Sequence, residues 1–486
     1  MEEKIRLFEP NIVWHYFLEI LKIPRPSKKE EKIREYLINF GKEKGLETIV
    51  DEIGNILIRK SASQGMEDRK STVLQSHIDM VCEKNEDVNF NFDTDVIIPR
   101  IDGEWVKATG TTLGADDGIG IAAQLAILGA NNISHGPIEC LFTVDEETGL
   151  TGAFGLKPNL LQSEILLNLD SEDEGELFIG CAGGKDTLVK IPLHKTKTPS
   201  NTIAYRINVK GLKGGHSGDE IDKGLGNANK IINRLLWEAD KSFGINLAWM
   251  EGGNLRNAIA REAFAIVVVD INKQKDFKEY INTYSIIAKQ EYHTTDSNLN
   301  ITIDKTDIPN EVLDEKTQFN LLNSLYACPH GVITWSQDIE GFVETSTNLA
   351  SVRIKDEHIL ITTSQRSSVE SAKNNICQMV ASVFQMAGAE IKHTDGYPGW
   401  TPNPNSAIMN IISISYEKLF NIKPKVLAIH AGLECGLIGE TYPKMDMVSF
   451  GPTIKGAHSP DERLKINTVK MFWDLTLDVL KNIPKR

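Results

Sequence analysis

Apolar side chains recur at helical spacing in two stretches near the start of the chain. The first stretch covers residues 10–21 (PNIVWHYFLEIL) and is closed by Pro24 and Pro26. The second runs from about residue 28 to residue 44, after Ser27, which is a suitable N-cap residue. The pattern therefore predicts two amphipathic helices.

Shorter apolar runs follow, and several of them end in acidic or imidazole side chains. Residues 48–60 (TIVDEIGNILIRK) are typical of a β-hairpin with its turn at the Gly-Asn pair. Three apolar strands and one small-residue helix are predicted at residues 71–81, 138–147, 164–171 and 118–130. Functional groups at strand ends indicate an α/β fold, because such folds bind ligands at the carboxyl ends of their strands.

The pattern of predicted strands and helices changes after the CAGG sequence that ends at Gly184. Further strands and helices follow as a separate β-α-β pattern, and a stretch rich in Pro, Gly and Asn (residues 393–406) reads as a linker. We therefore expect a catalytic domain in two segments, residues 1–185 and 396–486. An inserted α+β lid and dimerisation domain, residues 186–395, interrupts it.

Composition permits a two-domain enzyme and excludes several other classes. A chain of 486 residues exceeds the size at which single cores stop growing. Its net charge of −14 argues against nucleic acid or an anionic membrane surface as a partner. The chain opens on charged residues without an apolar leader and has no membrane-length apolar run. Six scattered cysteines without a CxxC pair predict reduced, mostly buried thiols, so we expect a cytoplasmic protein.

Five side chains of the kinds that bind divalent metals stand in separate motifs. They are His77 in SHIDM, Asp116 in GADDG, Glu147 in DEETG, Asp170 in NLDSED and His458 in GAHSPDER. Two imidazoles and three carboxylates can hold two ions if one carboxylate bridges them, and paired ions form a hydrolytic site. Each motif alone has an ordinary reading, such as a core histidine or a solvated acidic turn, so the prediction rests on their combination.

Two acids are expected to assist these ligands. The strand period places Asp79 on the same face as His77, where its carboxylate can accept a hydrogen bond from the second ring nitrogen. The alternative, a core histidine beside a solvated acid, is equally compatible with this motif taken alone. In GADDG, Asp116 is assigned to metal, and Asp117 is expected to cap the helix that follows.

The remaining acids divide between metal binding and proton transfer. Neighbouring residues at a strand end point apart, so we assign Glu147 to metal and Glu146 to proton transfer as general base. Asp170 ends an apolar strand, where a buried carboxylate needs a cation or a backbone cap as compensation. His458 lies in a Gly/Ser/Pro loop that can deliver an imidazole without helical constraint.

Seven motifs together resemble one enzyme family over nearly the whole chain: SHIDMV, GTTLGADDGIGIA, DEETGLTGA, NLDSED, GGHSG, HAGLECG and GAHSPDER. They are similar to the dizinc exopeptidases, and within them to the cytosolic aminoacyl-histidine (Xaa-His) dipeptidases. Glutamate carboxypeptidase and the tripeptidase PepT belong to the same family. The resemblance implies a zinc-exopeptidase-like α/β catalytic domain, with a mixed sheet flanked by helices, and an inserted α+β lid.

The resemblance also assigns the metal ligands. It places His77 and Asp170 on one zinc and Glu147 and His458 on the other, with Asp116 as the bridge. Cobalt or manganese often substitutes in sites of this donor set.

Further roles follow from the same resemblance. Asp79 corresponds to the acid that orients a ligand, and Glu146 to the base. The Asp116–Asp117 peptide bond is expected to be cis, and many relatives carry Asn where Asp117 stands.

In the lid, the resemblance assigns an oxyanion donor and a substrate grip. His216 in GGHSG would stabilise the tetrahedral oxyanion, although a histidine in a glycine-rich turn is otherwise unremarkable. Asn257, Arg366 and Gly432 resemble the group that holds the substrate's free carboxylate, a task suited to an arginine fork. A homodimer through the lid is expected, and the sequence leaves open whether His216 serves its own chain's site or its partner's.

The expected activity is hydrolysis of dipeptides, Xaa-His such as β-Ala-His and other unblocked dipeptides. Glu146 would take a proton from the attacking water and return it to the leaving amine. A tripeptidase, an N-acyl amino acid deacylase and a non-catalytic peptide-binding protein remain alternatives. So does a metal-independent hydrolase using Cys435 near His430, although nothing in the sequence marks that thiol as activated.

Overall fold

The chain forms two compact units in the computed structural model, which describes residues 2–355 and 357–486. The first unit contains Met1–Gly180, Pro402–Ala428 and Leu433–Arg486, and the second contains Cys181–Thr401 with Ile429–Gly432. The second unit therefore interrupts the first, and the chain crosses between them after Gly180 and Thr401, near the expected junctions at 185 and 395.

The first unit is built on a mixed eight-stranded sheet. Its order is β1 (Glu47–Val50), β2 (Ile56–Lys60), β6 (Ile138–Thr143), β3 (Thr72–His77), β7 (Ile165–Asn168), β23 (Asp446–Ser449), β8 (Glu176–Cys181) and β22 (Lys425–Ile429). Strand β3 runs parallel to β6 and β7, whereas β1 and β2 form the predicted antiparallel hairpin. The α/β class and the mixed sheet are confirmed.

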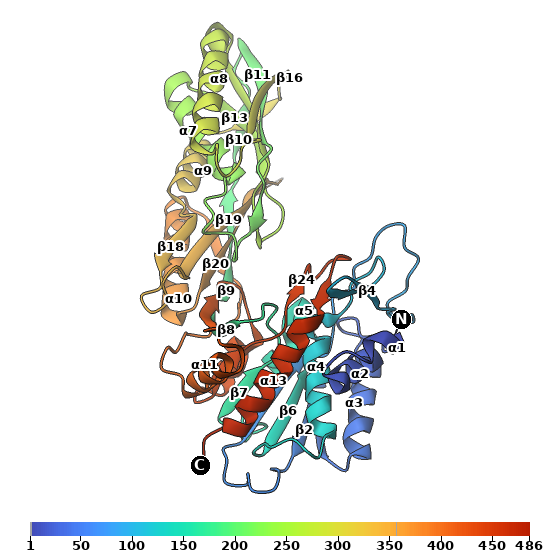
Figure 1. Ribbon diagram of the computed structural model, residues 1–486. Helices are drawn as coiled ribbons and strands as arrows, with labels where there is room; N and C mark the ends of the chain where they lie inside the picture. Colours follow the sequence, from blue (N-terminus) through green and yellow to red (C-terminus); the bar gives the residue numbers. More distant parts are fainter. Residues whose placement is uncertain (1, 356) are drawn as a thin grey trace. The chain divides into compact units, whose positions relative to one another are not determined.

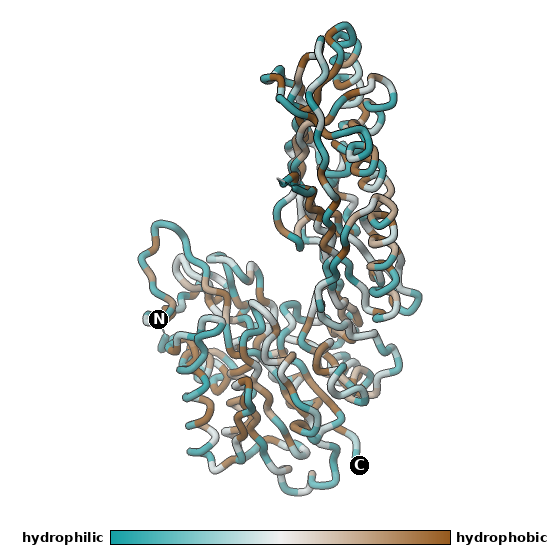
Figure 2. The backbone as a smooth tube through the Cα atoms, turned by 180° about the vertical axis from the view of Figure 1, so that it is seen from behind, coloured by the Kyte–Doolittle hydropathy of each residue, from teal (hydrophilic) through white to brown (hydrophobic). Residues whose placement is uncertain are grey.

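Burial explains why the central strands read as apolar runs. Every residue of β3, β6 and β7 is buried, as expected for parallel strands covered on both faces. In Figure 2, brown hydrophobic segments run through the interior of this unit.

Helices pack around this sheet (Figure 1). They are α1 (Glu2–Ile5), α2 (Asn11–Ile20), α3 (Glu31–Glu43), α4 (Ala115–Gly129), α5 (Glu146–Gly149), α6 (Thr151–Gly155), α11 (Ala407–Phe420), α12 (Glu434–Thr441) and α13 (Ile466–Asn482). A small sheet of β24 (Ile454–Lys455), β25 (Arg463–Lys465), β5 (Trp105–Lys107) and β4 (Arg100–Asp102) accompanies them. The two predicted N-terminal helices are confirmed as α2 and α3.

The expected N-cap of α3 is wrong. Lys28 has φ +66°, a left-handed conformation that a helix cannot include, and α3 begins only at Glu31. The hydroxyl of Ser27 instead donates a hydrogen bond of 2.7 Å to Asp79. Ser27 therefore belongs to the surroundings of the candidate site.

The second unit is α+β, as expected. Its main antiparallel sheet has the order β16 (Asn300–Thr306), β11 (Thr202–Lys210), β15 (Ala263–Asp270), β13 (Asn246–Gly252), β19 (Val343–Ile354), β20 (His358–Ser367), β9 (Gly183–Pro192) and β21 (Glu390–His393), with β18 (Gly331–Trp335) beside β19. Short pairs join β10 (Lys195–Lys197) to β17 (Glu311–Leu313) and β12 (Gly215–His216) to β14 (Ala258–Ile259). The helical elements are α7 (Ala228–Phe243), η1 (Ile271–Lys273), α8 (Gln274–Glu291), α9 (Glu315–Ala327) and α10 (Glu370–Met386).

Two further observations bear on the sequence expectations. Five of the six cysteines are buried and Cys82 is half-buried, which agrees with the expectation of mostly buried thiols. Among residues 2–355 and 357–486, no helix combines the length and apolarity that a membrane span requires.

Candidate active site

The candidate site lies in the first unit, where several strands end. His77 is the last residue of β3, Asp170 follows β7, and Glu147 lies in α5, shortly after β6. Asp116 lies at the start of α4, and His458 lies in the loop between β24 and β25. Side chains that are up to 381 positions apart (458 − 77) in the sequence are therefore brought together by the sheet.

Asp116 stands between the two histidines. Its Oδ1 atom lies 3.0 Å from Nε2 of His77, and its Oδ2 atom lies 3.1 Å from Nε2 of His458. The first histidine also approaches Asp170, with Nε2 and Oδ1 3.4 Å apart. The second approaches Glu147, with Nε2 and Oε2 3.1 Å apart. Two clusters, each with one histidine, thus share one carboxylate.

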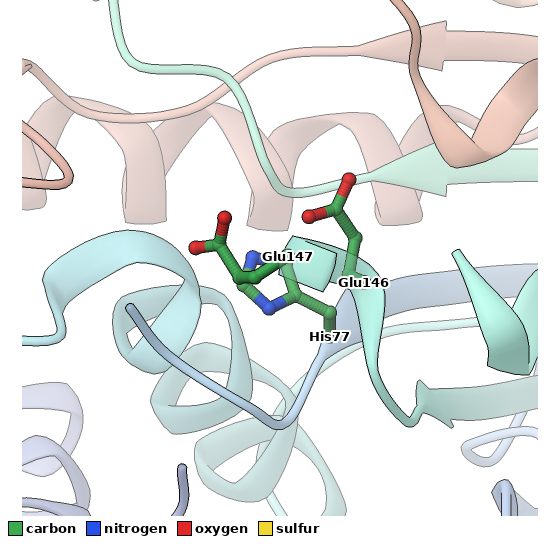
Figure 3. Close-up of side chains that lie close together, drawn as sticks. All are labelled: His77, Glu146 and Glu147. Atoms are coloured by element: carbon green, nitrogen blue, oxygen red, sulfur yellow. The ribbon is translucent and has the colours of Figure 1, made fainter. Parts of the chain in front are cut away.

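Glu146 lies beside this pair of clusters. Ligand atoms of His77, Glu146 and Glu147 all lie within 4.8 Å of one another. Figure 3 shows the two neighbouring glutamates leaving the backbone in different directions. Burial and the charges of nearby carboxylates raise the pKa of Glu146 well above its usual range, against the opposing effect of His77.

Asp79 is 0 % exposed and holds His77 from the other side of the ring. Its Oδ1 lies 3.3 Å from Nδ1 of that histidine, and its two oxygens accept the backbone N–H groups of Glu146 and Glu147 at 3.0 and 3.2 Å. Burial alone would raise the pKa of Asp79, but its interaction with the His77 ring and the hydrogen bond that it accepts from Ser27 outweigh burial and lower that pKa to about 2.

The start of α4 has an irregular backbone. The Asp116–Asp117 peptide bond is cis, which confirms the expectation from the resemblance. Asp117 accepts the backbone N–H of Gly120 at 3.0 Å and so caps the helix, also as expected. Burial raises the pKa of Asp117 well above its usual range.

The clustered carboxylates keep the imidazoles charged in the metal-free protein. Hydrogen bonds to Asp116 and Glu147 raise the pKa of His458 to about 11. Burial raises the pKa of Asp170 to about 6, although His77 opposes that shift. The site therefore carries an excess of negative charge, which favours the binding of cations.

Sequence reasoning missed three acids in the surroundings. Glu434 is 0 % exposed and accepts hydrogen bonds from Gln75 and Thr143 at 2.6 and 2.7 Å. Glu172 is half-buried, and burial together with the charge of Asp116 raises its pKa to about 8. Glu462 is 2 % exposed. The sequence signal that could have found these acids is their position in three of the family motifs, HAGLECG, NLDSED and GAHSPDER.

In the second unit, His216 ends the short strand β12, and Asn257 immediately precedes β14, the strand that pairs with it. His216 pairs with Ala258 across β12 and β14, and the carbonyl of Asn257 accepts the N–H of Ser217 at 2.8 Å. Both residues line a cavity of about 660 Å³. Nδ1 of His216 lies 3.1 Å from Oδ2 of Asp219, an acid that sequence reasoning also missed.

Arg366 and Gly432 meet at a third residue of this unit. The phenolic oxygen of Tyr397 accepts a hydrogen bond of 2.9 Å from Nη1 of Arg366. A Cβ atom added to Gly432 would lie 2.8 Å from Cε2 of the Tyr397 ring. The pKa of Asp219 is lowered. Burial would raise it, but a hydrogen bond to His216 and the charge of Arg366 act in the opposite direction and outweigh burial. The four lid residues therefore fall into two neighbouring groups.

Comparisons with known proteins identify the family. Residues 73–482 match the model of "Peptidase family M20/M25/M40". The cytosol non-specific dipeptidase of Escherichia coli (strain K12) is 46% identical over 477 residues, which cover 98% of each chain.

Solved structures agree with this result. The crystal structure of aminoacylhistidine dipeptidase from Vibrio alginolyticus is similar with a TM-score of 0.93 and 44% identity, over 99% of this chain and 98% of that chain. Aminopeptidase PepT from Bacillus cereus ATCC 10987 shares the fold, with a TM-score of 0.58 and 16% identity over 98% and 99% of the two chains. The chain belongs to peptidase family M20/M25/M40.

Proposed function

We propose that this protein hydrolyses dipeptides at a pair of divalent metal ions. The observation that carries the proposal is the position of Asp116, whose two oxygens face the Nε2 atoms of His77 and His458 at 3.0 and 3.1 Å. In this assignment His77 and Asp170 would hold one ion, Glu147 and His458 would hold the other, and Asp116 would contribute to both.

The donor set fits such ions. Carboxylate oxygens and imidazole nitrogens suit zinc, and cobalt or manganese can substitute. The Oε1 atom of Glu147 is buried and has no hydrogen-bond partner among the described residues, as expected for an atom that has a further ligand to meet. Bound ions would polarise the peptide carbonyl and favour ionisation of the attacking water.

Glu146 is the proposed general base. Its carboxylate lies within 4.8 Å of ligand atoms of His77 and Glu147, yet it belongs to neither of the clusters that share Asp116. It would accept a proton from the attacking water and return it to the leaving amine. The raised pKa of Glu146 in the metal-free protein suits a group that must hold that proton between the two steps.

The second unit would recognise the substrate. We assign His216 as the donor to the oxyanion, and Asn257, Arg366 and Gly432 as the grip on the free carboxylate. Support comes from the matching motifs and from the cavity that His216 and Asn257 line. We further propose a homodimer formed through this unit.

The substrates we propose are unblocked dipeptides, Xaa-His dipeptides among them, and the proposed location is the cytosol. Support comes from the names of two relatives that align over almost the entire chain, a cytosol non-specific dipeptidase and an aminoacylhistidine dipeptidase. Tripeptide or N-acyl amino acid hydrolysis is the competing possibility within the same metal chemistry.

One assay tests the proposal. The purified protein is stripped with a chelator, reloaded with zinc, cobalt or manganese, and assayed on β-Ala-His, other dipeptides, Gly-Gly-Gly and an N-acetyl amino acid. We expect hydrolysis of dipeptides that is lost on chelation and regained on metal addition. Activity confined to the tripeptide or the acyl substrate would replace the substrate assignment. Full activity after chelation would reject the metal site, and a metal-loaded protein inert on every substrate would favour a binding role.

A further inference from the structure

A single buried carboxylate holds the backbone that precedes Asp116. The Oε2 atom of Glu462 accepts the N–H groups of Leu113 and Gly114 at 2.7 and 2.9 Å. Its Oε1 atom accepts those of Ala115 and Asp116 at 2.7 and 3.3 Å. Four consecutive backbone donors therefore share one side chain, which uses all the acceptor directions of an ionised carboxylate.

The same side chain belongs to the loop that carries His458. Glu462 immediately precedes β25, and its own N–H donates to the carbonyl of Ser459 at 3.0 Å. The Ser459 hydroxyl in turn donates to the carbonyl of Gly456 at 2.7 Å. The loop between Gly456 and Glu462 is thus tied by internal hydrogen bonds at the positions on either side of the histidine.

A buried cation holds the opposite side of the turn. Arg25 is 1 % exposed, and its guanidinium donates to the carbonyls of Gly114, Ile78 and Asp79. The turn at Gly114, where φ is +71°, therefore lies between an anion that receives its N–H groups and a cation that donates to its carbonyl. Removal of either charge would leave buried backbone groups without partners.

We propose that Glu462 is a positioning residue that joins the Asp116 turn to the His458 loop, so that the two metal positions form together. The inference rests on the proposed function, because it concerns the same metal ligands. Glu462 itself contacts none of the assigned ligand side chains; it contacts the backbone N–H of Asp116 and lies four residues after His458. Its effect would pass through the backbone to the shared carboxylate.

Two conservative substitutions of Glu462 test its contact with the four backbone N–H groups. In Glu462→Gln the side chain keeps its size, but an amide NH2 group would face two backbone N–H donors. In Glu462→Asp the anion is kept and the reach is shorter by one methylene. Asp461→Asn is the matched control, because it makes the same charge change at the neighbouring position, where the side chain is 84% exposed.

The experiment measures metal binding to the full chain, by competition with a chromophoric chelator and by the visible spectrum of the cobalt-loaded protein. We expect Glu462→Gln to bind both ions about 10- to 100-fold more weakly, with an altered cobalt spectrum. Circular dichroism of the metal-free variant should match the wild type. Glu462→Asp should recover part of the affinity, and Asp461→Asn should behave as wild type.

Each outcome has a defined meaning. Wild-type affinity and spectrum in Glu462→Gln, or an equal loss in Asp461→Asn, would overturn the proposal. Unfolding of both Glu462 variants whether or not metal is present would also overturn it, because the residue would then serve the fold in general. A wild-type chain that binds no metal would instead reject the proposed function on which the inference rests.

Discussion

The Oδ1 atom of Asp79 lies 3.3 Å from Nδ1 of His77, so the ring is held from behind while its Nε2 atom faces Asp116. The same carboxylate accepts the backbone N–H groups of Glu146 and Glu147. One buried acid therefore orients a proposed ligand on β3 and fixes the chain that carries the proposed base.

Replacement of Asp79 by Asn should weaken both the orientation of His77 and the support of the backbone that carries Glu146. The amide keeps the size of the side chain but lacks the charge that stabilises the imidazole and the backbone donors. We expect kcat/KM on a dipeptide and the affinity for metal each to fall by about 10- to 100-fold. Ser27→Ala, which removes only the 2.7 Å hydrogen bond to the other carboxylate oxygen, is the control and should cost less. Equal losses in the two variants would contradict the orienting role of the charge.

Glu146→Ala should separate catalysis from metal binding. Because Glu146 belongs to neither cluster that shares Asp116, the variant should still bind two ions. Its kcat should fall by about 100- to 10,000-fold, since the proton acceptor is lost. The measurement is kcat alongside the metal content of the same sample, with Glu147→Ala as the variant that should lose metal. Near-normal turnover in Glu146→Ala would refute the base assignment.

Metal binding should release protons and grow stronger as pH rises. In the metal-free protein, hydrogen bonds to Asp116 and Glu147 raise the pKa of His458 to about 11. Burial would lower the pKa of His77, but Asp170 and Asp116 outweigh it and raise that pKa well above its usual value. The raised pKa values favour the protonated imidazoles in the metal-free protein, and a metal ion must displace these protons because it binds neutral imidazole.

Below the metal-free pKa of each histidine, protons compete with the ion, so affinity rises with pH. Titration calorimetry in two buffers of different ionisation enthalpy should show at least one proton released for each histidine, and affinity should be higher at about pH 8 than at about pH 6. Binding with no proton release would show that the histidines are already neutral or are not ligands.

The five proposed ligands could be predicted from the sequence because each stands where an apolar segment or a glycine-rich loop ends. An acid such as Asp170 at the end of an apolar strand is costly unless it is compensated, and that cost is visible in the sequence. Arg25 and Glu462 gave no such signal. Their partners are backbone groups, and the N–H groups that Glu462 receives belong to residues about 350 positions away.

Predictions from local patterns were also wrong where a side chain forms a hydrogen bond with a residue distant in the sequence. Ser27 has the character of an N-cap, but the positive φ of Lys28 delays the helix and leaves the hydroxyl to Asp79. Tyr397 lies in a segment that reads as a linker, yet its hydroxyl meets Arg366. Such pairings depend on the approach of distant strands, which no local period records.

Gly432→Ala should impair substrate binding through Tyr397. The added methyl would lie 2.8 Å from Cε2 of that ring, closer than real Cβ contacts allow, and the ring would have to move. The phenolic oxygen accepts from Nη1 of Arg366, so the guanidinium would lose its support. We expect KM for a dipeptide to rise by about tenfold, the equivalent of one lost hydrogen bond to a charged group, with a smaller change in kcat.

Two variants make this prediction specific. Tyr397→Phe removes the hydroxyl without adding bulk and should raise KM in the same direction. Gly439→Ala in α12 adds a methyl that meets only the flexible end of Met447, at 3.0 Å, and should leave both constants unchanged. Metal content should be the same in all three, because the proposed ligands lie in the first unit. If kcat fell with KM constant in Gly432→Ala, the residue would act on the chemical step, and its assignment to the substrate grip would be wrong.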